Sequence, residues 1–361
     1  MLDDKLKVIH LFAPGPLGGA EKVIISGLKT LVSTHKNLEL WLIKELRVPE
    51  FCGDFIKHLD SSNIKIKVFD TKKPLDLSLI KNLKQSFNDS EVSIIHAHGI
   101  KASFYGHLSK PAASKFILTH HGNTSHTLKI KIYEYIEQRI MRKADCTIAV
   151  SETMLKSLNQ KTIPNTELVE NLLSFNPATR TIPQNEKLEL VIIGRVSPEK
   201  GHMDLLMALV DIKIEYNLTI IGTGSEVELI KDYILKYNLE DRVHLIGFRS
   251  DIRPYLLSAD VLLMPSHREG LPMILIEAIC SGVPVIGSSV GALKYLISKN
   301  GILFTPKNTD EIKGSILKFN KNKKNYLENG LIDSSKFQER FHPNRWVEST
   351  LNIYNKVFSQ K

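Results

Sequence analysis

Short apolar runs rich in Val, Ile and Leu alternate along the chain with longer segments whose apolar residues recur at helical spacing. This alternation predicts parallel strands joined by helices that cover both faces of a sheet. The strands expected in the first half span residues 7–13, 38–44, 65–70, 92–98, 115–120 and 145–150. In the second half they span residues 188–194, 218–221, 243–246, 261–264, 283–286 and 301–304. The pattern therefore predicts two doubly wound α/β domains of similar size.

The loop 174–187 separates the two series, and its prolines, Pro177 and Pro183, mark it as the domain boundary. We expect a first domain of residues 1–175, a second of residues 176–339, and a C-terminal helix over 340–361. The apolar residues of that helix fall on one face, so it needs a surface to pack against. Ligands of doubly wound sheets bind beyond the carboxyl ends of the strands, and a cleft between the two domains is the expected site.

Composition sets the class of protein. A chain of 361 residues with 42% hydrophobic and 24% charged residues is typical of a globular protein with two domains. The three cysteines lie far apart without metal spacing, so we expect neither a disulfide framework nor a zinc site. The N-terminus lacks the basic start of a signal peptide, and no run approaches the roughly 18 apolar residues of a membrane span. The sequence predicts a cytoplasmic protein.

The net charge of +9 comes from lysine-rich stretches among ordinary acidic residues. One interpretation is simply a set of solvated faces. The alternatives are attraction to phosphate-bearing substrates or to the anionic inner face of a membrane. A nucleic-acid partner is not expected, because no recognised reading motif accompanies the charge.

Two glutamates, Glu269 and Glu277, flank an apolar segment that follows a predicted strand and enters a helix whose first turn is expected to contain Pro272. Proline costs nothing at a helix start, and the free N–H groups of that turn can face an anion. A carboxylate in so apolar a helix needs hydrogen-bond donors, and sugar or ribose hydroxyls would serve. The alternative is that Glu277 points to solvent and Glu269 is a loop charge.

Arg195 and Lys200 follow the first strand of the second domain, in the segment 194–200. Two cations at the carboxyl edge of a sheet suit a diphosphate, although they could also be exposed loop charges. Gly222 and Gly224 follow the next strand and resemble a phosphate-binding turn, but a tight turn explains them equally well. No Asp-x-Asp pattern is present to bring a divalent ion, so we expect protein groups to neutralise the diphosphate without a metal or other cofactor.

In the first domain, Gly18 and Gly19 lie between the first strand and a helix, where glycines let the backbone approach a ligand or simply form a turn. Their spacing is not a dinucleotide fingerprint, which argues against a dehydrogenase. Histidines lie at the ends of two neighbouring strands, namely His96, His98, His120 and His121. No carboxylate or cysteine lies at ligand spacing, so hydrogen bonding to a polar substrate is favoured over a metal, with packed or capping histidines as the alternative.

Taken in order, these features resemble glycosyltransferase family 4, whose members are retaining enzymes of the GT-B fold. The resemblance covers nearly the whole chain and rests on segments 18–21, 119–122, 150–151, 170–171, 194–200, 222–224, 245–248 and 269–277. It implies two Rossmann-like domains facing a central cleft, with the C-terminal helix crossing back to the N-terminal domain. It also implies a metal-independent enzyme whose co-substrate is a nucleotide sugar, by family frequency a UDP-sugar.

The resemblance also implies roles for single residues. Arg195 and Lys200 would hold the donor diphosphate, Glu277 the ribose, and Glu269 the transferred sugar. His121 would contact the sugar near the reacting carbon, which makes His121, Arg195, Lys200 and Glu269 the expected catalytic set. The remaining donor-binding candidates are Gly18, Gly19, Gly222, Gly224, Gly247, Phe248, Arg249, Gly270, Leu271 and Pro272. The acceptor-side candidates are His96, His98, His121, Ser151 and Asn171.

The function implied by the resemblance is transfer of a sugar to a glycan or lipid-linked acceptor, in bacterial lipopolysaccharide, capsule or exopolysaccharide synthesis. The leaving diphosphate would be stabilised electrostatically and its oxygen would take the acceptor's proton on the same face. Two alternatives stay open: a nucleotide-sugar epimerase of the same fold, and a non-catalytic nucleotide-sugar binder.

The segment 128–143 carries Lys and Arg residues together with isoleucines and tyrosines. A basic amphipathic helix of this kind can lie against anionic lipid. The alternative is a helix that packs its apolar face on the sheet and leaves its charges in solvent.

Overall fold

The computed structural model describes residues 6–59, 62–121, 128–174, 180–182 and 186–359, with the side chains of 128–131 excepted. The chain divides into two compact units, one of Met1–Ser174 with Phe341–Lys361 and the other of Phe175–Arg340. Pro177 and Pro183 of the predicted boundary loop, like Gly122 of the histidine motif, lie outside the described residues.

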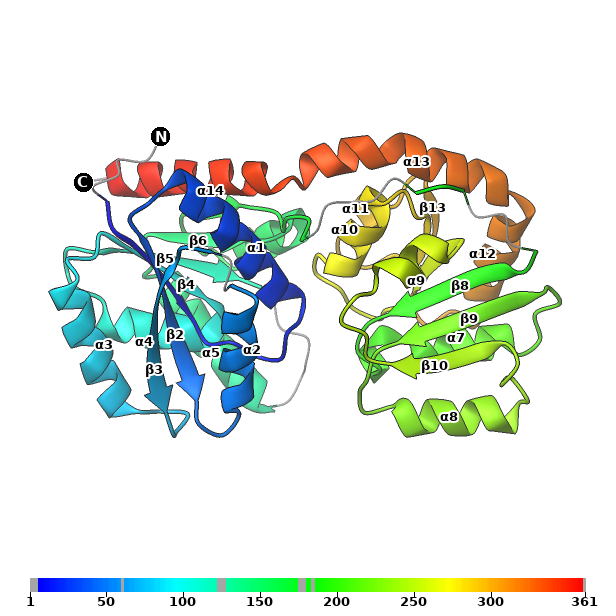
Figure 1. Cartoon of the computed structure of the whole chain (residues 1–361), viewed down its shortest axis with the longest axis horizontal. Helices are drawn as coiled ribbons and strands as arrows, with labels where there is room; N and C mark the ends of the chain where they lie inside the picture. The colour runs from blue at the N-terminus through cyan, green and yellow to red at the C-terminus, as the bar shows by residue number, and fades with distance from the viewer. Residues whose placement is uncertain (1–5, 60–61, 122–127, 175–179, 183–185, 360–361) are drawn as a thin grey trace. The chain divides into compact units, whose positions relative to one another are not determined.

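The first unit holds, among the described residues, a seven-stranded parallel sheet with the order β3-β2-β1-β4-β5-β6-β7. Its strands are β1 Val8–Phe12, β2 Leu38–Glu45, β3 Lys65–Thr71, β4 Ile94–His98, β5 Lys115–His120, β6 Cys146–Ala149 and β7 Thr166–Leu168. Its helices are α1 Gly19–Thr34, α2 Pro49–Lys57, α3 Leu77–Asp89, α4 Gly99–Ser109, α5 Leu128–Met141, α6 Glu152–Gln160 and α14 Pro343–Ser359 (Figure 1). The sequence pattern missed β7, because its three residues, Thr-Glu-Leu, are only half-buried at the sheet edge.

The second unit holds a six-stranded sheet with the order β10-β9-β8-β11-β12-β13 across the described residues, and its strand pairs are parallel. Its strands are β8 Leu188–Ile193, β9 Tyr216–Ile221, β10 Val243–Gly247, β11 Val261–Met264, β12 Val285–Ser288 and β13 Gly301–Phe304. Its helices are the 3₁₀ turn η1 Pro198–Lys200, then α7 His202–Leu209, α8 Val227–Lys236, α9 Arg253–Ser258, α10 Met273–Cys280, α11 Leu293–Leu296, α12 Thr309–Lys321 and α13 Lys323–Arg340. The predicted pair of Rossmann-like parallel sheets is confirmed.

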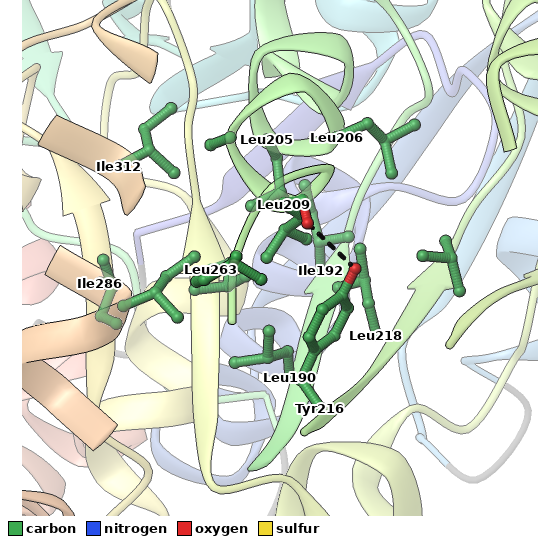
Figure 2. Packing of buried hydrophobic residues seen from close by; sticks show 14 of the residues in the cluster. Leu190, Ile192, Leu205, Leu206, Leu209, Tyr216, Leu218, Leu263, Ile286 and Ile312 are labelled. Atoms are coloured by element: carbon green, nitrogen blue, oxygen red, sulfur yellow. Dashed lines mark hydrogen bonds between the residues drawn. The ribbon is translucent and has the colours of Figure 1, made fainter. Parts of the chain in front are cut away.

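Side chains of β8 and α7 meet in the core of the second unit, which Figure 2 shows from close by. Leu190 and Ile192 of β8 lie in one buried cluster with Leu209 of α7. Tyr216 belongs to the same cluster, and its hydroxyl donates to the Leu209 carbonyl at 3.4 Å. A buried phenol needs such a partner. The packing fixes α7, whose first turn carries site residues, on the sheet.

The C-terminal helix α14 belongs to the first unit, where it packs beside α1 (Figure 1). Trp346 makes this packing possible together with Gly27 of α1, because a Cβ at Gly27 would lie 2.7 Å from the Trp346 ring. The return of the last helix to the N-terminal domain is thereby confirmed. None of the helices in the described part of the chain combines the length and apolar character needed to cross a bilayer.

Candidate functional site

Three loops meet beyond the carboxyl ends of β8, β9 and β10. The Val196 N–H donates to the Thr223 carbonyl at 2.9 Å, and the Gly222 N–H donates to the Gly247 carbonyl at 3.0 Å. A Cβ at Gly222 would lie 1.8 Å from the Gly194 oxygen, and one at Gly224 would lie 2.1 Å from the Val196 oxygen. Close packing of the loops therefore requires both glycines. This edge is where ligands of doubly wound sheets bind.

Lys200 and Glu269 form an ion pair at this edge. The Lys200 ammonium donates to Glu269 Oε1 at 2.6 Å, and the Ser266 hydroxyl donates to the same oxygen at 2.7 Å. The Glu269 side chain is 6% exposed, so the alternative of a loop charge is wrong. Because the two side chains are hydrogen-bonded to each other, a ligand that binds one of them lies beside the other as well.

Gly201 fixes the loop that presents Lys200. Its φ of +68° is left-handed, and a Cβ there would lie 2.1 Å from the Pro265 carbonyl oxygen. His267, two residues after Pro265, donates its backbone N–H to the Glu199 carbonyl at 2.8 Å. The loops after β8 and β11 are therefore joined on both sides of the ion pair, which holds Lys200 and Glu269 in register.

Glu277 lies on α10 and is 3% exposed, so the alternative that it points to solvent is wrong. The helix begins at Met273, with Pro272 at the N-cap rather than inside the first turn as predicted. Proline has no N–H to donate, and the N–H groups of Leu275 and Ile276 donate to the Pro272 carbonyl at 3.1 Å and 3.4 Å. The N–H groups of Met273 and Ile274 are therefore the ones at this helix start without an acceptor within the helix. A helix start of this kind favours a negatively charged ligand.

The loop after β12 also borders the site, although the sequence did not predict it. A Cβ at Gly291, whose φ is +50°, would lie 2.2 Å from the Glu269 carbonyl oxygen. The Ala292 N–H donates to the Gly270 carbonyl at 2.9 Å. The loop therefore packs against the backbone of Glu269 and Gly270 and supports it. In the sequence only Gly291 could have indicated this loop, and a single glycine is common in turns of every kind.

His202 also lies at the site, although the sequence did not predict it. It lines a small pocket with Gly194, Lys200, Ser266 and Glu269, and it is 1% exposed. Neither ring nitrogen has a hydrogen-bond partner among the residues that the structure describes. Burial lowers its pKa to about 4, so the imidazole is neutral at pH 7 and offers one donor and one acceptor. The sequence around His202, Lys-Gly-His, does not predict that its side chain is buried.

The other predicted cation and the predicted base contacts lie at the surface of the second unit. Arg195 is exposed, and Phe248 is 61% exposed despite its size. Arg249 donates from its guanidinium to the Phe248 carbonyl at 2.9 Å and to the Tyr255 hydroxyl at 3.3 Å. These three side chains are accessible to a ligand.

In the first unit, Glu21 organises the predicted glycine turn. Its carboxylate accepts from the N–H of Gly18 at 3.1 Å and from that of Gly15 at 3.2 Å. Gly18 is the N-cap of α1, and Gly19 is its exposed first residue. The motif therefore carries its own capping carboxylate.

Four of the acceptor-side candidates come together in a small pocket of the first unit. His96, His98, His121 and Asn171 line it, beside residues of α1 and α14. Ser151 is not among the lining residues; it is the N-cap of α6 and accepts from the Met154 N–H at 3.3 Å. The pocket therefore supports the grouping of the histidines but not that of Ser151.

The sequence has no carboxylate at ligand spacing from the histidines, but the fold brings one beside His120. Glu137 of α5, only 2% exposed, lies 3.2 Å from Nδ1 of His120. The sequence could not show this pair, because it depends on how α5 packs against the end of β5. The structure also adds His10 and Tyr354, which hydrogen-bond to the predicted histidines.

The buried imidazoles of four residues are neutral at pH 7, namely those of His10, His96, His98 and His121. Burial lowers the pKa of His10 to about 3 and that of His121 to about 4. Burial and the neighbouring imidazoles hold the pKa of His96 and of His98 well below the ordinary value. The pocket therefore presents uncharged donors and acceptors, which suits hydroxyl groups better than anions.

The predicted basic helix α5 divides its apolar residues between two surroundings. Ile136 and Ile140 pack on the core, as the alternative interpretation required. Ile132 and Tyr135 are more than half exposed, and the Arg139 guanidinium lies over the Tyr135 ring at 5.0 Å. The side chains of Lys129 and Lys131 lie outside the described residues.

Comparison with known proteins shows the family. Residues 17–171 match the model "Glycosyltransferase Family 4", and residues 178–331 match "Glycosyl transferases group 1". The chain is a family 4-type glycosyltransferase of the GT-B fold. The predicted family and the predicted transferase activity are thereby confirmed.

This glycosyltransferase is 25% identical, over 81% of its length and 82% of the relative's, to a UDP-Gal:alpha-D-GlcNAc-diphosphoundecaprenol alpha-1,3-galactosyltransferase of Escherichia coli. It is 24% identical, over 79% of its length and 80% of the relative's, to an N-acetyl-alpha-D-glucosaminyl L-malate synthase of Bacillus anthracis. Among solved structures, HepE of Anabaena in complex with UDP superposes with a TM-score of 0.82 at 20% identity, over 97% of this chain and all of that one. That likeness shows the fold.

Proposed function

We propose that this glycosyltransferase transfers a sugar from a UDP-sugar, with retention of the anomeric configuration, to a glycan or lipid-linked acceptor in cell-surface polysaccharide synthesis. The observation that carries the proposal is the Lys200–Glu269 ion pair at the carboxyl edge of the second sheet. The named substrates of the Escherichia coli galactosyltransferase, a UDP-sugar and a sugar diphosphate lipid, support the donor and the acceptor class. The UDP complex of HepE supports the same donor base.

In the proposed reaction the donor's diphosphate lies beside Lys200 and Arg195. Lys200 supplies a point charge from a partly buried position, and the exposed Arg195 supplies a planar fork of donors. The start of α10 adds N–H groups and the positive end of a helix dipole. Together they stabilise the negative charge that develops on the departing phosphate, the main contribution to catalysis in this account.

Two carboxylates orient the donor. Glu277 is buried. An ionised carboxylate accepts several hydrogen bonds, so this side chain suits the two ribose hydroxyls. Glu269, held by Lys200 and Ser266, is placed for hydroxyls of the transferred sugar. The bond from the anomeric carbon to the phosphate oxygen breaks, and the bond to the acceptor oxygen forms on the same face. The acceptor's proton passes to the departing phosphate oxygen, so no protein nucleophile is needed.

The test is transfer from UDP-galactose, UDP-glucose and UDP-N-acetylglucosamine to N-acetylglucosaminyl diphosphate on a short isoprenoid. We expect a product with one added sugar residue by mass spectrometry, with an α linkage by NMR, and full activity in EDTA. A β-linked product would refute retention. Epimerisation of the donor without acceptor would favour the epimerase alternative, and donor binding without any turnover would favour the non-catalytic binder.

A matched pair of variants ties the activity to the site. Glu269→Gln removes the charge that pairs with Lys200, and we expect kcat/KM to fall about 100-fold. Glu240→Gln makes the same change at an exposed position of the same unit and should leave kcat/KM unchanged. Equal activity of the two variants would remove Glu269 from the mechanism.

A further inference from the structure

Five buried or nearly buried side chains of the first unit form one continuous hydrogen-bonded chain. Oγ1 of Thr119 lies 2.7 Å from Nε2 of His96, and Nδ1 of His96 lies 2.7 Å from the Tyr354 hydroxyl. The Tyr354 hydroxyl lies 3.0 Å from Nε2 of His10, and Nδ1 of His10 lies 2.8 Å from Nε2 of His98. The last atom, Nδ1 of His98, has no hydrogen-bond partner within the described part of the chain, and His98 lines the small pocket.

Each bond of this chain carries one hydrogen, which restricts the protonation of every member. A neutral imidazole has one N–H and one bare nitrogen, and a hydroxyl donates one hydrogen. If Nδ1 of His98 carries its hydrogen, its Nε2 must accept from Nδ1 of His10. Nε2 of His10 must then accept from Tyr354, whose oxygen accepts from Nδ1 of His96. All three histidines are then protonated at Nδ1.

The opposite arrangement is equally complete. If Nδ1 of His98 is bare, its Nε2 donates to Nδ1 of His10, and Nε2 of His10 donates to the Tyr354 oxygen. Tyr354 then donates to Nδ1 of His96, and Nε2 of His96 donates to Thr119. All three histidines are now protonated at Nε2. The chain therefore has two fully bonded states, and mixed tautomers break a bond.

We infer that the chain Thr119–His96–Tyr354–His10–His98 sets the tautomer of His98 and thereby prepares Nδ1 of His98 to bind a hydroxyl group of the acceptor sugar. The inference rests on the proposed function, because it assigns the first-unit pocket to the acceptor. Tyr354 is a positioning residue: it lies on α14, hydrogen-bonds to two of the histidines and joins the two halves of the chain. A ligand that donates to His98 selects the Nε2 form of all three imidazoles, and one that accepts selects the Nδ1 form.

A hydroxyl suits this end of the chain for two reasons. It can donate or accept, so it matches either state of His98. It is also uncharged, as are the four histidines of the network and pocket, whose pKa values burial lowers. A bare carboxylate or phosphate oxygen would match only one state.

The first test needs no ligand. The long-range ¹H–¹⁵N spectrum of the ¹⁵N-histidine-labelled full chain, assigned with single His→Gln variants, reports the tautomer of each neutral imidazole. We expect His10, His96 and His98 to share one tautomer, and Tyr354→Phe to shift the His98 signals although Tyr354 does not bond to His98 directly. Mixed tautomers in the wild type, or unchanged His98 signals in Tyr354→Phe, would overturn the inference.

Tyr105→Phe is the matched control. Tyr105 is a fully buried tyrosine of the same unit, and its hydroxyl donates to the Pro74 carbonyl and accepts from the Asp76 N–H, away from the chain. It should leave the His98 signals unchanged. Should Tyr354→Phe fail to fold, Thr119→Val interrupts the chain at its other end and should shift the same signals.

The second test uses transfer to N-acetylglucosaminyl diphosphate on a short isoprenoid. We expect Tyr354→Phe to raise the acceptor KM about tenfold at unchanged donor KM, and Tyr105→Phe to change neither. A wild-type chain without transfer would fail the proposed function; an active wild type with equal KM values in both variants would fail this inference alone. The ligand nitrogens of His10, His96 and His98 lie within 4.8 Å of one another, so zinc is the competing occupant. Stoichiometric zinc in the purified protein, lost in His10→Gln, would overturn the hydrogen-bonded chain.

Discussion

Lowering the pH from 7.5 to 5.5 should destabilise the first unit strongly. His10, His96, His98 and His121 are neutral in the folded unit, because burial depresses their pKa values. In the unfolded chain a histidine has its ordinary pKa of about 6.5. The folded pKa is the lower one, so the stabilisation is present above pH 6.5 and is lost as the pH falls below it.

The magnitude follows from the shifts. Each histidine that binds a proton only when unfolded costs about 1.4 kcal/mol per pH unit below 6.5. Four such groups lower the free energy of unfolding by about 5 kcal/mol at pH 5.5, a large part of the 5–15 kcal/mol of an ordinary domain. With a typical dependence on denaturant, the urea midpoint should fall by roughly 2 M.

The chain offers a selective probe. Both of its tryptophans, Trp41 and Trp346, belong to the first unit, so their fluorescence follows the unfolding of that unit alone. His10→Asn should reduce the pH dependence by one proton, whereas His58→Asn, at an exposed position, should not change it. Equal urea midpoints at pH 7.5 and 5.5 would refute the neutral buried cluster.

Three further predictions concern the second unit and the surface of the first. Gly201→Ala should destabilise the second unit by at least ~2 kcal/mol in chemical denaturation, because the φ of Gly201 is +68° and a Cβ would lie 2.1 Å from the Pro265 oxygen. The control is Gly53→Ala, because a Cβ at Gly53 would have open space around it. His202→Leu should leave the free energy of unfolding within about 1 kcal/mol of wild type, because no described residue hydrogen-bonds to the imidazole, but should lower the transfer rate. An unchanged rate would remove His202 from the site. We also propose that α5 contacts anionic membranes through the exposed side chains of Ile132 and Tyr135. The protein should float with anionic but not with neutral liposomes, and the double variant Ile132→Asn/Tyr135→Asn should not float. Flotation that does not depend on lipid charge would contradict this proposal.

The alternation of apolar runs and helical segments was enough to predict both sheets, because parallel strands buried on both faces are continuous apolar runs. It failed at β7, which is short, polar and half-buried at an edge. It also placed the start of β12 two residues early, since Pro284 has no N–H to donate to the sheet.

Candidate site residues could be chosen from the sequence where they follow strands, as Lys200 and Glu269 do. Partners supplied by distant helices were not. Glu137 reaches His120 from α5, and Tyr354 reaches His96 from 258 residues along the chain. Spacing carries no information about such contacts, because they depend on how helices pack on the sheet. His202 escaped notice for a related reason: its burial comes from the fold of the loop around Gly201.

Calorimetric titration of the full chain with UDP tests most directly whether the second unit holds a nucleotide diphosphate. We predict binding by the wild type and by the exposed-site control Glu240→Gln, and affinity at least tenfold weaker in Glu277→Gln and in Arg195→Ala, as expected for lost charged hydrogen bonds. Thermal unfolding in the presence of UDP should show the same order. Absence of UDP binding by the wild type, or equal affinity in Glu277→Gln, would contradict the account.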